Sequence, residues 1–276
     1  MKNRLIIATF CFFAGLGTLQ AQHELSFNAF GGYQPINLTF SQNGKTSGNI
    51  GFVAGIGYNY NINKQWSIGT GADLSLYSSS VDFAQLNDTH VDYDTFESTS
   101  FTFTADITNY KENVSMLLLE IPLTVRYTLP VGKNSIYIMG GGKFGLPLST
   151  NYTASAGNLT TTGGYYDENQ VYHDVPEVFG TGKMEDQSGS WVANTSIQLT
   201  VEAAYRFAIG AKMGLSVGVF CNYGLNNMQS KNTEFPIAFN VNSNKPYSSN
   251  SIINSNLVSA VKPLAIGLKL RFDLGL

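Results

Sequence analysis

Apolar and polar residues alternate one by one along most of this chain, whereas the spacing of an amphipathic helix is almost absent. Strict alternation puts apolar side chains on one face of a β-strand and polar side chains on the other. In residues 264–274 every even position is apolar, and the odd positions include Lys269, Arg271 and Asp273. The pattern predicts eight strands, at residues 24–33, 50–60, 66–78, 114–129, 135–148, 194–207, 214–224 and 259–274.

The connections between these strands alternate between two kinds. Short turns fall at residues 61–65, 130–134 and 208–213, and the other four connections are much longer. Antiparallel strands that run up and down place every short turn at one end, as in outer-membrane barrels with periplasmic turns and long extracellular loops. Strands of about ten residues or more also suit a tilted bilayer crossing, which needs ~9–11. We therefore predict an all-β fold: a transmembrane antiparallel up-and-down β-barrel of eight strands, with both chain ends in the periplasm.

Aromatic residues gather where the predicted strands meet the short turns. This predicted aromatic girdle consists of Tyr58, Tyr60, Trp66, Tyr127, Tyr205, Phe207 and Phe272. A second set near the long connections consists of Tyr33, Phe144, Trp191 and Tyr223. Amphipathic rings settle at the level of lipid headgroups, so two belts are expected of a surface that faces lipid. The alternative explanation is that aromatic residues are common in any strand.

The first residues have the organisation of a secretory leader. Lys2 and Arg4 precede a nearly apolar run that ends at Leu19, and the small residue Ala21 suits a signal peptidase. The apolar run is too short for a membrane-spanning helix, which needs ~20 residues. We predict a signal peptide over residues 1–21 and a single outer-membrane β-barrel domain over residues 22–276. Cys221 is then the only cysteine left, which excludes an internal disulfide and a cysteine-based metal cluster.

The polar strand faces place charged side chains inside the predicted barrel. An eight-stranded barrel is just wide enough for its own side chains to fill. The predicted lumen charge network consists of Asp73, Glu120, Arg126, Lys143, Glu202, Arg206, Lys269, Arg271 and Asp273. A hairpin turn centred on Val131 and Gly132 puts Glu120 opposite Lys143, and we expect these two to form an ion pair. Unpaired interior charges cost several kcal/mol each, so we expect a closed, charge-paired lumen, with an ion path or gated pore as the alternative.

The same alternation suits a soluble lipocalin-type barrel with its apolar face turned inward. The asymmetry of the connections and the aromatic belts favour the membrane version, with the protein integral to the outer membrane. Residues 80–112 hold seven acidic side chains and one lysine, and residues 149–192 hold six and one. These acidic stretches suit divalent cations that bridge lipopolysaccharide, or they serve solubility alone, and the metal question stays open. With no basic run, nucleic acid is not an expected partner.

Two stretches inside the long connections alternate as well, at residues 99–107 and 235–241. They extend hairpins beyond the membrane, fold into a cap, or form a ninth and tenth strand that widens the lumen.

The chain resembles the outer-membrane β-barrel proteins of Bacteroidota, the broad group of OmpA-like and PorT-type eight-stranded barrels. The resemblance covers residues 22–276 and rests on the leader ending in Ala21-Gln22, the glycine-rich opening stretch 27–33 and the closing stretch 266–272. It implies outer-membrane lipid, lipopolysaccharide and the barrel-insertion machinery as partners. Such barrels end in an aromatic residue, whereas this chain ends in Leu274-Gly275-Leu276.

We expect a non-enzymatic cell-surface barrel with no cofactor and no catalytic residues, whose long loops bind an extracellular protein or glycan ligand. The alternative is a narrow pore or an accessory of transport or secretion, as the PorT-type resemblance allows. A third hypothesis is a barrel enzyme acting on lipid or peptide, for which His173, Ser155 and Ser188 share one long connection.

Overall fold

In a computed structural model, the chain is described for residues 22–95, 97–175, 178–184, 186–230, 235–239 and 247–276. The predicted signal peptide, residues 1–21, lies outside these residues, as do Glu177, Glu185 and Val241 of the stretches discussed above. No helix within the described ranges is long and apolar enough to cross a membrane.

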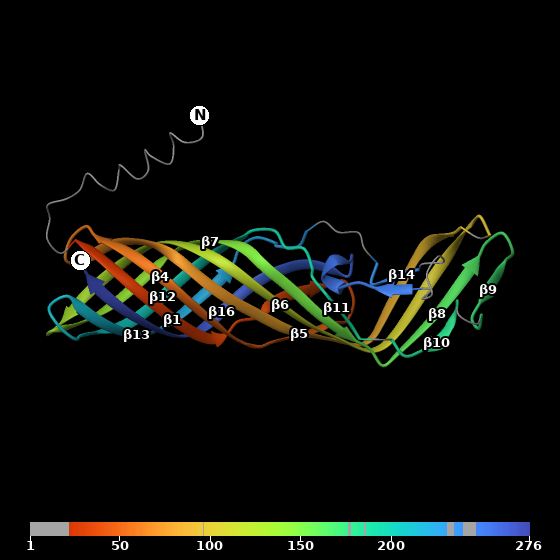
Figure 1. Cartoon of the computed structure of the whole chain (residues 1–276), viewed down its shortest axis with the longest axis horizontal. Coiled ribbons are helices and arrows are strands. Elements are labelled where there is room, and N and C mark those ends of the chain that lie inside the picture. The colour runs from red at the N-terminus through yellow and green to blue at the C-terminus, as the bar shows by residue number, and fades with distance from the viewer. Residues whose placement is uncertain (1–21, 96, 176–177, 185, 231–234, 240–246) are drawn as a thin grey trace, which may run out of the picture.

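Eight antiparallel strands close into a ring, as the alternation predicted. The strands are β1 (His23–Tyr33), β4 (Ile50–Asn61), β5 (Trp66–Asp94), β6 (Thr99–Val131), β7 (Asn134–Ser155), β12 (Ser196–Ala208), β13 (Met213–Gly224) and β16 (Val258–Gly275). Each pairs with the next in this order, and β16 pairs with β1 to close the barrel. The three short turns and the C-terminus lie together at one end of the barrel, on the left of Figure 1. The predicted fold class and strand number are confirmed.

Three strands run beyond their predicted ends, and β5 and β6 take up most of the long connection predicted at residues 79–113. β5 and β6 remain paired along their whole length, from Trp66 opposite Tyr127 to Asp94 opposite Thr99. β7 accompanies β6 as far as Lys111, and β8 (Asn158–Tyr165) then takes the same edge of β6. The predicted end of β5 falls too early because Ser78, Ser79 and Ser80 interrupt the alternation of apolar and polar residues.

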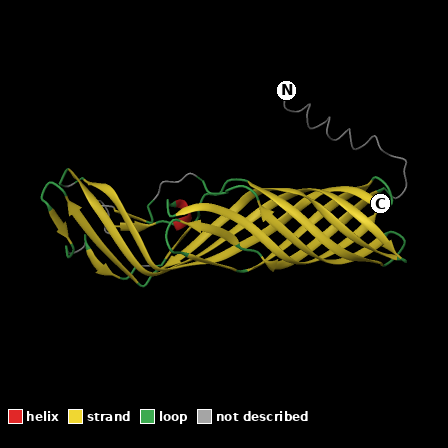
Figure 2. Ribbon diagram, turned by 180° about the vertical axis from the view of Figure 1, so that it is seen from behind, coloured by secondary structure: helices red, strands yellow, loops and turns green. Residues whose placement is uncertain are grey.

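The extended strands build a folded body beyond the outer end of the barrel, on the right of Figure 1 and on the left of Figure 2. We call this body the head, made of the described residues of 85–108, 157–182 and 235–239. Besides parts of β5, β6 and β8, it contains three short strands, β9 (Gln170–Tyr172), β10 (Gly180–Gly182) and β14 (Ile237–Phe239). The remaining short elements are β2 (Ile36–Phe40), β3 (Lys45–Gly48), β11 (Gln187–Gly189), β15 (Tyr247–Ser249) and the 3-10 helix η1 (Ile252–Asn254).

The buried face of the β5–β6 hairpin changes sides where the barrel meets the head. Buried positions of β5 are odd-numbered up to Phe83 and even-numbered from Leu86 onward. On β6 the change falls between Ile107 and Tyr110, at Asn109, whose φ of 52° lies in the left-handed region that Asn tolerates well. Above this kink, alternate residues pack into the head instead of into the barrel.

The hydrophobic core of the head is continuous with the one at the outer end of the barrel, and it is built from the alternating stretches found in the sequence. Phe101 and Phe103 of β6 are fully buried, and both rings pack against Phe239 of β14, Phe101 edge to face and Phe103 at a tilt. The prediction that residues 99–107 extend a hairpin and contribute to a cap is confirmed. The ring holds eight strands, so the alternative of a ninth and tenth wall strand is wrong.

The outer wall of the barrel is apolar, and its inner wall is charged. Phe52, Leu123 and Leu268 are 67%, 72% and 67% exposed, whereas Glu120 and Asp273 are fully buried inside. This polarity is the reverse of a lipocalin, so the soluble alternative is wrong.

The seven residues of the predicted girdle occupy outward positions of the wall near the short turns. Trp66 packs on Tyr127 and Tyr205 on Phe207, with ring centroids 4.8 Å and 4.7 Å apart. Trp191 of the second set is only 2% exposed, because it packs among hydrophobic side chains beyond the barrel, so its assignment to an outer belt is wrong.

Candidate functional site

Charged side chains fill the barrel in three layers. In the layer nearest the periplasm, Glu24 lies 2.7 Å from Arg126 and 3.3 Å from Arg206, and Arg206 also contacts Asp273 at 3.1 Å. Ser216 donates to Asp273 at 3.2 Å. Each carboxylate at this end therefore meets at least one guanidinium.

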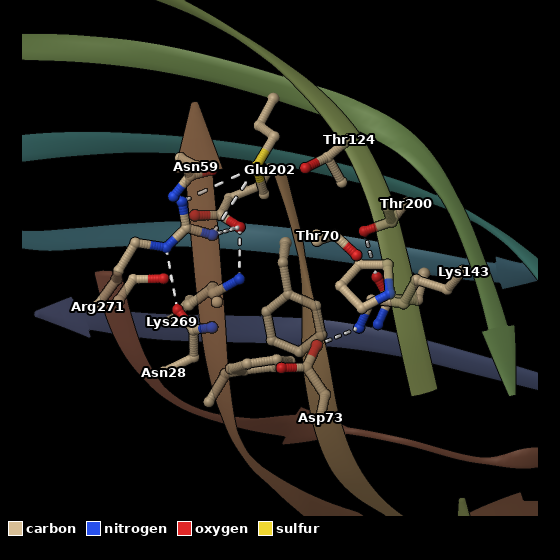
Figure 3. A pocket seen from close by; sticks show the side chains of 17 residues that line it. Asn28, Asn59, Thr70, Asp73, Thr124, Lys143, Thr200, Glu202, Lys269 and Arg271 are labelled. Carbon is tan, nitrogen blue, oxygen red and sulfur yellow. Dashed lines mark hydrogen bonds and ion pairs between the residues drawn. The ribbon is translucent and has the colours of Figure 1, made fainter. Parts of the chain in front are cut away.

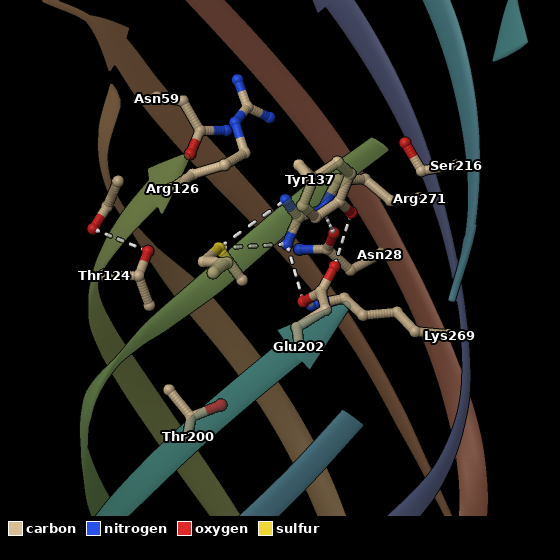
Figure 4. Close-up of polar contacts among 12 residues, drawn as sticks. Asn28, Asn59, Thr124, Arg126, Tyr137, Thr200, Glu202, Ser216, Lys269 and Arg271 are labelled. Carbon is tan, nitrogen blue, oxygen red and sulfur yellow. Dashed lines mark hydrogen bonds and ion pairs between the residues drawn. The ribbon is translucent and has the colours of Figure 1, made fainter. Parts of the chain in front are cut away.

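The middle layer is centred on Glu202 of β12, which accepts from three groups (Figure 4). Lys269 lies 2.6 Å and Arg271 3.1 Å from its Oε2, and the hydroxyl of Tyr137 donates to its Oε1 at 2.5 Å. Arg271 also donates to Asn28 at 3.0 Å. These contacts join four wall strands, so the middle layer connects opposite sides of the barrel across the lumen.

The third layer surrounds Lys143 of β7, whose ammonium lies 2.9 Å from Glu120 and 3.1 Å from Asp73. Glu120 accepts three further hydrogen bonds, from Ser75, Tyr77 and Gln198. The expected register is wrong: Glu120 stands opposite Gly145, and Lys143 stands opposite Pro122. The expected ion pair does form, but between diagonal positions of β6 and β7, because the long lysine side chain reaches across to Glu120.

All nine side chains of the predicted network point inward, and the sequence interpretation missed a tenth. Glu24 is 5% exposed and alternates with Ser26 and Asn28 on the inward face of β1. This alternation could have placed Glu24 in the lumen, but the glycines later in the strand made it unclear which face of β1 was apolar. With Glu24 the network holds five acidic and five basic side chains, so its formal charges cancel.

The space left between the layers is small (Figure 3). A cavity of about 30 Å³, lined by Asp73, Lys143, Glu202 and Arg271 among others, has room for about two waters. Its polar lining suits water, and Asp73 Oδ1 has no partner among the described residues. A wider recess of about 440 Å³ opens at the periplasmic end and is lined in part by Lys64, Arg126 and Arg206.

Above the charged layers, a hydrophobic cluster fills the outer end of the barrel. We call it the outer plug: Ile36, Val81, Phe83, Tyr110, Val114, Met116, Leu118, Ile252, Ile253, Val258 and Val261, each at most 2% exposed. The 3-10 helix η1, red in Figure 2, lies here between barrel and head. The outer plug thus covers the outer side of the charged layers.

One carboxylate, Glu112, is buried beside the outer plug at 1% exposure. Its oxygens accept from the hydroxyl of Tyr110, from Ser251 at 2.5 Å and from the backbone N–H of Ile252 at 3.1 Å. Burial raises the pKa of Glu112 above its ordinary value, and these hydrogen bonds partly offset that effect. Glu112 thus fastens the start of η1 to β6.

The residues considered for catalysis are not assembled. His173 is exposed and has no hydrogen-bonded serine or acid partner among the described residues. His90 is buried in the head, stacked on Phe235 with ring centroids 3.6 Å apart, and lies 3.6 Å from Asp88. Across the described ranges, no group of three or more His, Cys, Asp or Glu side chains is arranged to hold a metal ion.

A closed antiparallel ring of eight strands, apolar toward the outside and charge-paired within, defines an integral outer-membrane β-barrel protein. The chain belongs to the family of outer membrane protein beta-barrel domains, which matches residues 17–177. The match is to this broad family, and the Bacteroidota or PorT-type assignment stays a prediction.

Solved structures similar to this chain are outer-membrane proteins of low sequence identity. Neisserial surface protein A is 13% identical over 92% of this chain and 97% of its own, with a TM-score of 0.35. OprG from Pseudomonas aeruginosa is 12% identical, with coverages of 91% and 96% and a TM-score of 0.35. The outer membrane protease OmpT from Escherichia coli is 11% identical, with coverages of 94% and 99% and a TM-score of 0.33. No curated protein matches the sequence.

Proposed function

We propose that this protein is a non-enzymatic display barrel, whose closed lumen anchors an extracellular head that binds a ligand or partner at the cell surface. The observation that carries the proposal is the combination of a sealed interior with an ordered head. Ten charges cancel inside the wall, the outer plug fills the outer end of the barrel, and β5 and β6 continue as one hairpin that carries the same hydrophobic core into the head.

The sealed lumen argues against the alternative of a narrow pore or transport accessory. A path for ions requires water-filled space, and the cavity between the charged layers holds about two waters. Opening such a path means separating buried ion pairs, which costs ~3–5 kcal/mol when one partner of a pair is lost. Catalysis is disfavoured because His173 lacks an orienting partner in the described part of the chain. Outer-membrane lipid, lipopolysaccharide and the barrel-insertion machinery complete the proposed set of partners.

A headless variant tests the proposal. It lacks residues 85–108, 157–182 and 235–239, each replaced by a short Gly-Ser link, so the membrane-spanning strands are unchanged. A shift of gel mobility on boiling, shared by both proteins, checks that the barrel is folded. Cells that display the full chain or the headless variant are then compared for retention on surfaces coated with lipopolysaccharide, neutral polysaccharide, sulfated polysaccharide or an extracellular matrix protein.

The expected result is retention on at least one coating that depends on the head. The purified full chain is also expected to give no single-channel steps in planar bilayers in which a large porin conducts. Conductance together with equal retention of both proteins would establish the pore alternative instead.

A further inference from the structure

The outward face of the head carries a groove of about 300 Å³. It lies over β6, β8 and β9, on the side away from the head's core. The residues of its lining that face outward include Thr102, Thr104, Thr162, Gly164, Tyr166, Asn169 and Gln170. Every one of these side chains is uncharged, and hydroxyl, amide and aromatic groups predominate.

The floor of the groove holds Thr102, Thr104 and Thr162, which belong to a larger array of threonines on this face of the sheet. Thr104 of β6 pairs across the sheet with Thr89 of β5 on one side and with Thr162 of β8 on the other. Farther along β8, Thr160 pairs with Thr181 of β10, and their hydroxyls lie 2.9 Å apart. Such a face offers flat methyl groups and hydroxyls at the strand spacing of ~4.8 Å.

A fixed aromatic ring stands at one end of this floor. Tyr166 is 74% exposed, yet the hydroxyl of Thr102 donates to its hydroxyl oxygen at 2.8 Å. The turn behind it closes through a backbone hydrogen bond from Asn169 to Tyr166, and Asn169 takes a left-handed φ of 53°. An exposed ring held in place in the free protein lowers the entropy cost of binding.

The charges around the groove select among ligand classes. Residues 85–108 and 157–182 contain nine acidic residues and neither lysine nor arginine. Asp167 and Glu168 stand in the turn next to Tyr166, and Asp106 lies on the outward face of β6. The neighbouring carboxylates repel a phosphate, a sulfate or an acidic sugar, and no side chain that lines the groove is charged, so a cation finds no ion-pair partner inside it.

Building on the function proposed above, we propose that this groove binds a neutral saccharide. Sugar rings have an apolar face that stacks on an aromatic ring, as Tyr166 allows, and hydroxyl groups that pair with threonine hydroxyls and the amides of Asn169 and Gln170. A peptide strand would instead need a free sheet edge, and the groove lies over the paired interior of β6 and β8.

Gly164 offers a way to fill the groove without disturbing the fold. It takes ordinary strand geometry, and a Cβ there would meet its nearest atoms, in Thr102, at 3.8 Å, so a side chain is tolerated. Gly164→Leu therefore occupies the floor of the groove. Gly182→Leu on β10 is the matched control, because a Cβ at Gly182 meets nothing within 4 Å and Gly182 does not line the groove.

The test uses the full mature chain in lipid nanodiscs and saturation-transfer NMR. The probes are hexasaccharides of glucose, mannose, galactose and N-acetylglucosamine, a sulfated oligosaccharide, and oligolysine. At least one neutral hexasaccharide is expected to bind, and Gly164→Leu and Tyr166→Ala are each expected to weaken its binding about tenfold or more, as truncation of a central aromatic contact does. Gly182→Leu is expected to bind as the unaltered chain does.

Absence of binding by every neutral hexasaccharide would overturn the inference, and so would neutral binding that persists in Gly164→Leu. Binding of the sulfated probe or of oligolysine that is lost in Gly164→Leu would overturn it in favour of another ligand class. The headless variant separates the two proposals: retention of cells that needs the head but is indifferent to Gly164→Leu removes this inference and leaves the display function standing.

Discussion

At the scale of single residues, the interior leaves almost no space beside its charged groups. A Cβ on Gly55 would lie 2.0 Å from Asp73 Oδ1 and 2.7 Å from the carbonyl oxygen of Ala72. We predict that Gly55→Ala lowers the free energy of unfolding by about 1–3 kcal/mol, because overpacking forces Asp73 away from Lys143. Urea unfolding in lipid vesicles measures this. Gly142→Ala, whose Cβ would lie 3.7 Å from its nearest atom, is the control, and an equal loss in both variants would contradict the explanation.

A second prediction concerns Lys143, whose positive charge compensates the two buried carboxylates of Asp73 and Glu120. Lys143→Met leaves Asp73 and Glu120 without their cation, and we expect it to lower the free energy of unfolding by about 3–5 kcal/mol. Adding Asp73→Asn and Glu120→Gln to this variant is expected to recover most of the loss. Lys133→Met, in an exposed short turn, is the control and is expected to change stability by less than about 0.5 kcal/mol. If the triple variant is no more stable than Lys143→Met, the lysine acts through packing and not through charge.

The inward charges could be predicted from the sequence because alternation decides which face each one takes. The partner of each charged side chain could not be predicted, because the pairing register of two strands depends on the exact position of the turn between them. The expected turn at Val131 and Gly132 is displaced by one residue: Gly132 takes the left-handed φ of 62°, and Val131 pairs with Asn134. A turn displaced by one residue changes every cross-strand partner by two.

At the scale of elements, η1 is fastened by a carboxylate whose titration should be visible. Burial raises the pKa of Glu112 above the ordinary value of 4.5, so protonation favours the folded arrangement. The added stability is full below pH 4.5 and is lost as the pH rises through the raised pKa. We predict that amides of residues 251–258 are better protected from hydrogen exchange at pH 5 than at pH 8, after correction for intrinsic rates.

Glu112→Gln removes the titrating group while keeping a hydrogen-bond acceptor for Ser251. We expect its protection in residues 251–258 to be the same at both pH values. A difference that persists in Glu112→Gln would place the pH dependence on another group.

The membrane-spanning elements could be predicted because lipid demands one apolar face along the whole crossing. Alternation at residues 99–107 predicted one strand of the head, but the connection of the head to the barrel could not be predicted, because the buried face changes sides at Asn109. The three consecutive serines from Ser78 to Ser80 also predict the end of a strand, although β5 continues to Asp94.

At the scale of the whole molecule, the two ends of the barrel face different compartments. We predict that a cysteine placed at Thr181, in the head, reacts on intact cells with a membrane-impermeant maleimide. A cysteine at Lys64, in a short turn, is expected to react only after the outer membrane is permeabilised. Both are made in a Cys221→Ala background, because Cys221 is the one free thiol of the described residues. Labelling of the turn on intact cells would reverse the orientation.

The change of sides at Ala84 and Asn109 has a consequence for how such a chain can lengthen. Below it, the buried side chains of β5 point into the barrel, and above it they point into the core of the head. Adding one residue to β5 between the bilayer and the kink would point the side chains of Leu86 and His90 toward the solvent. Adding two residues would keep these side chains in the core of the head. The strands that carry the head can therefore lengthen only by two residues at a time. The distance of the head from the lipid then changes in steps of about 6.6 Å along the strand.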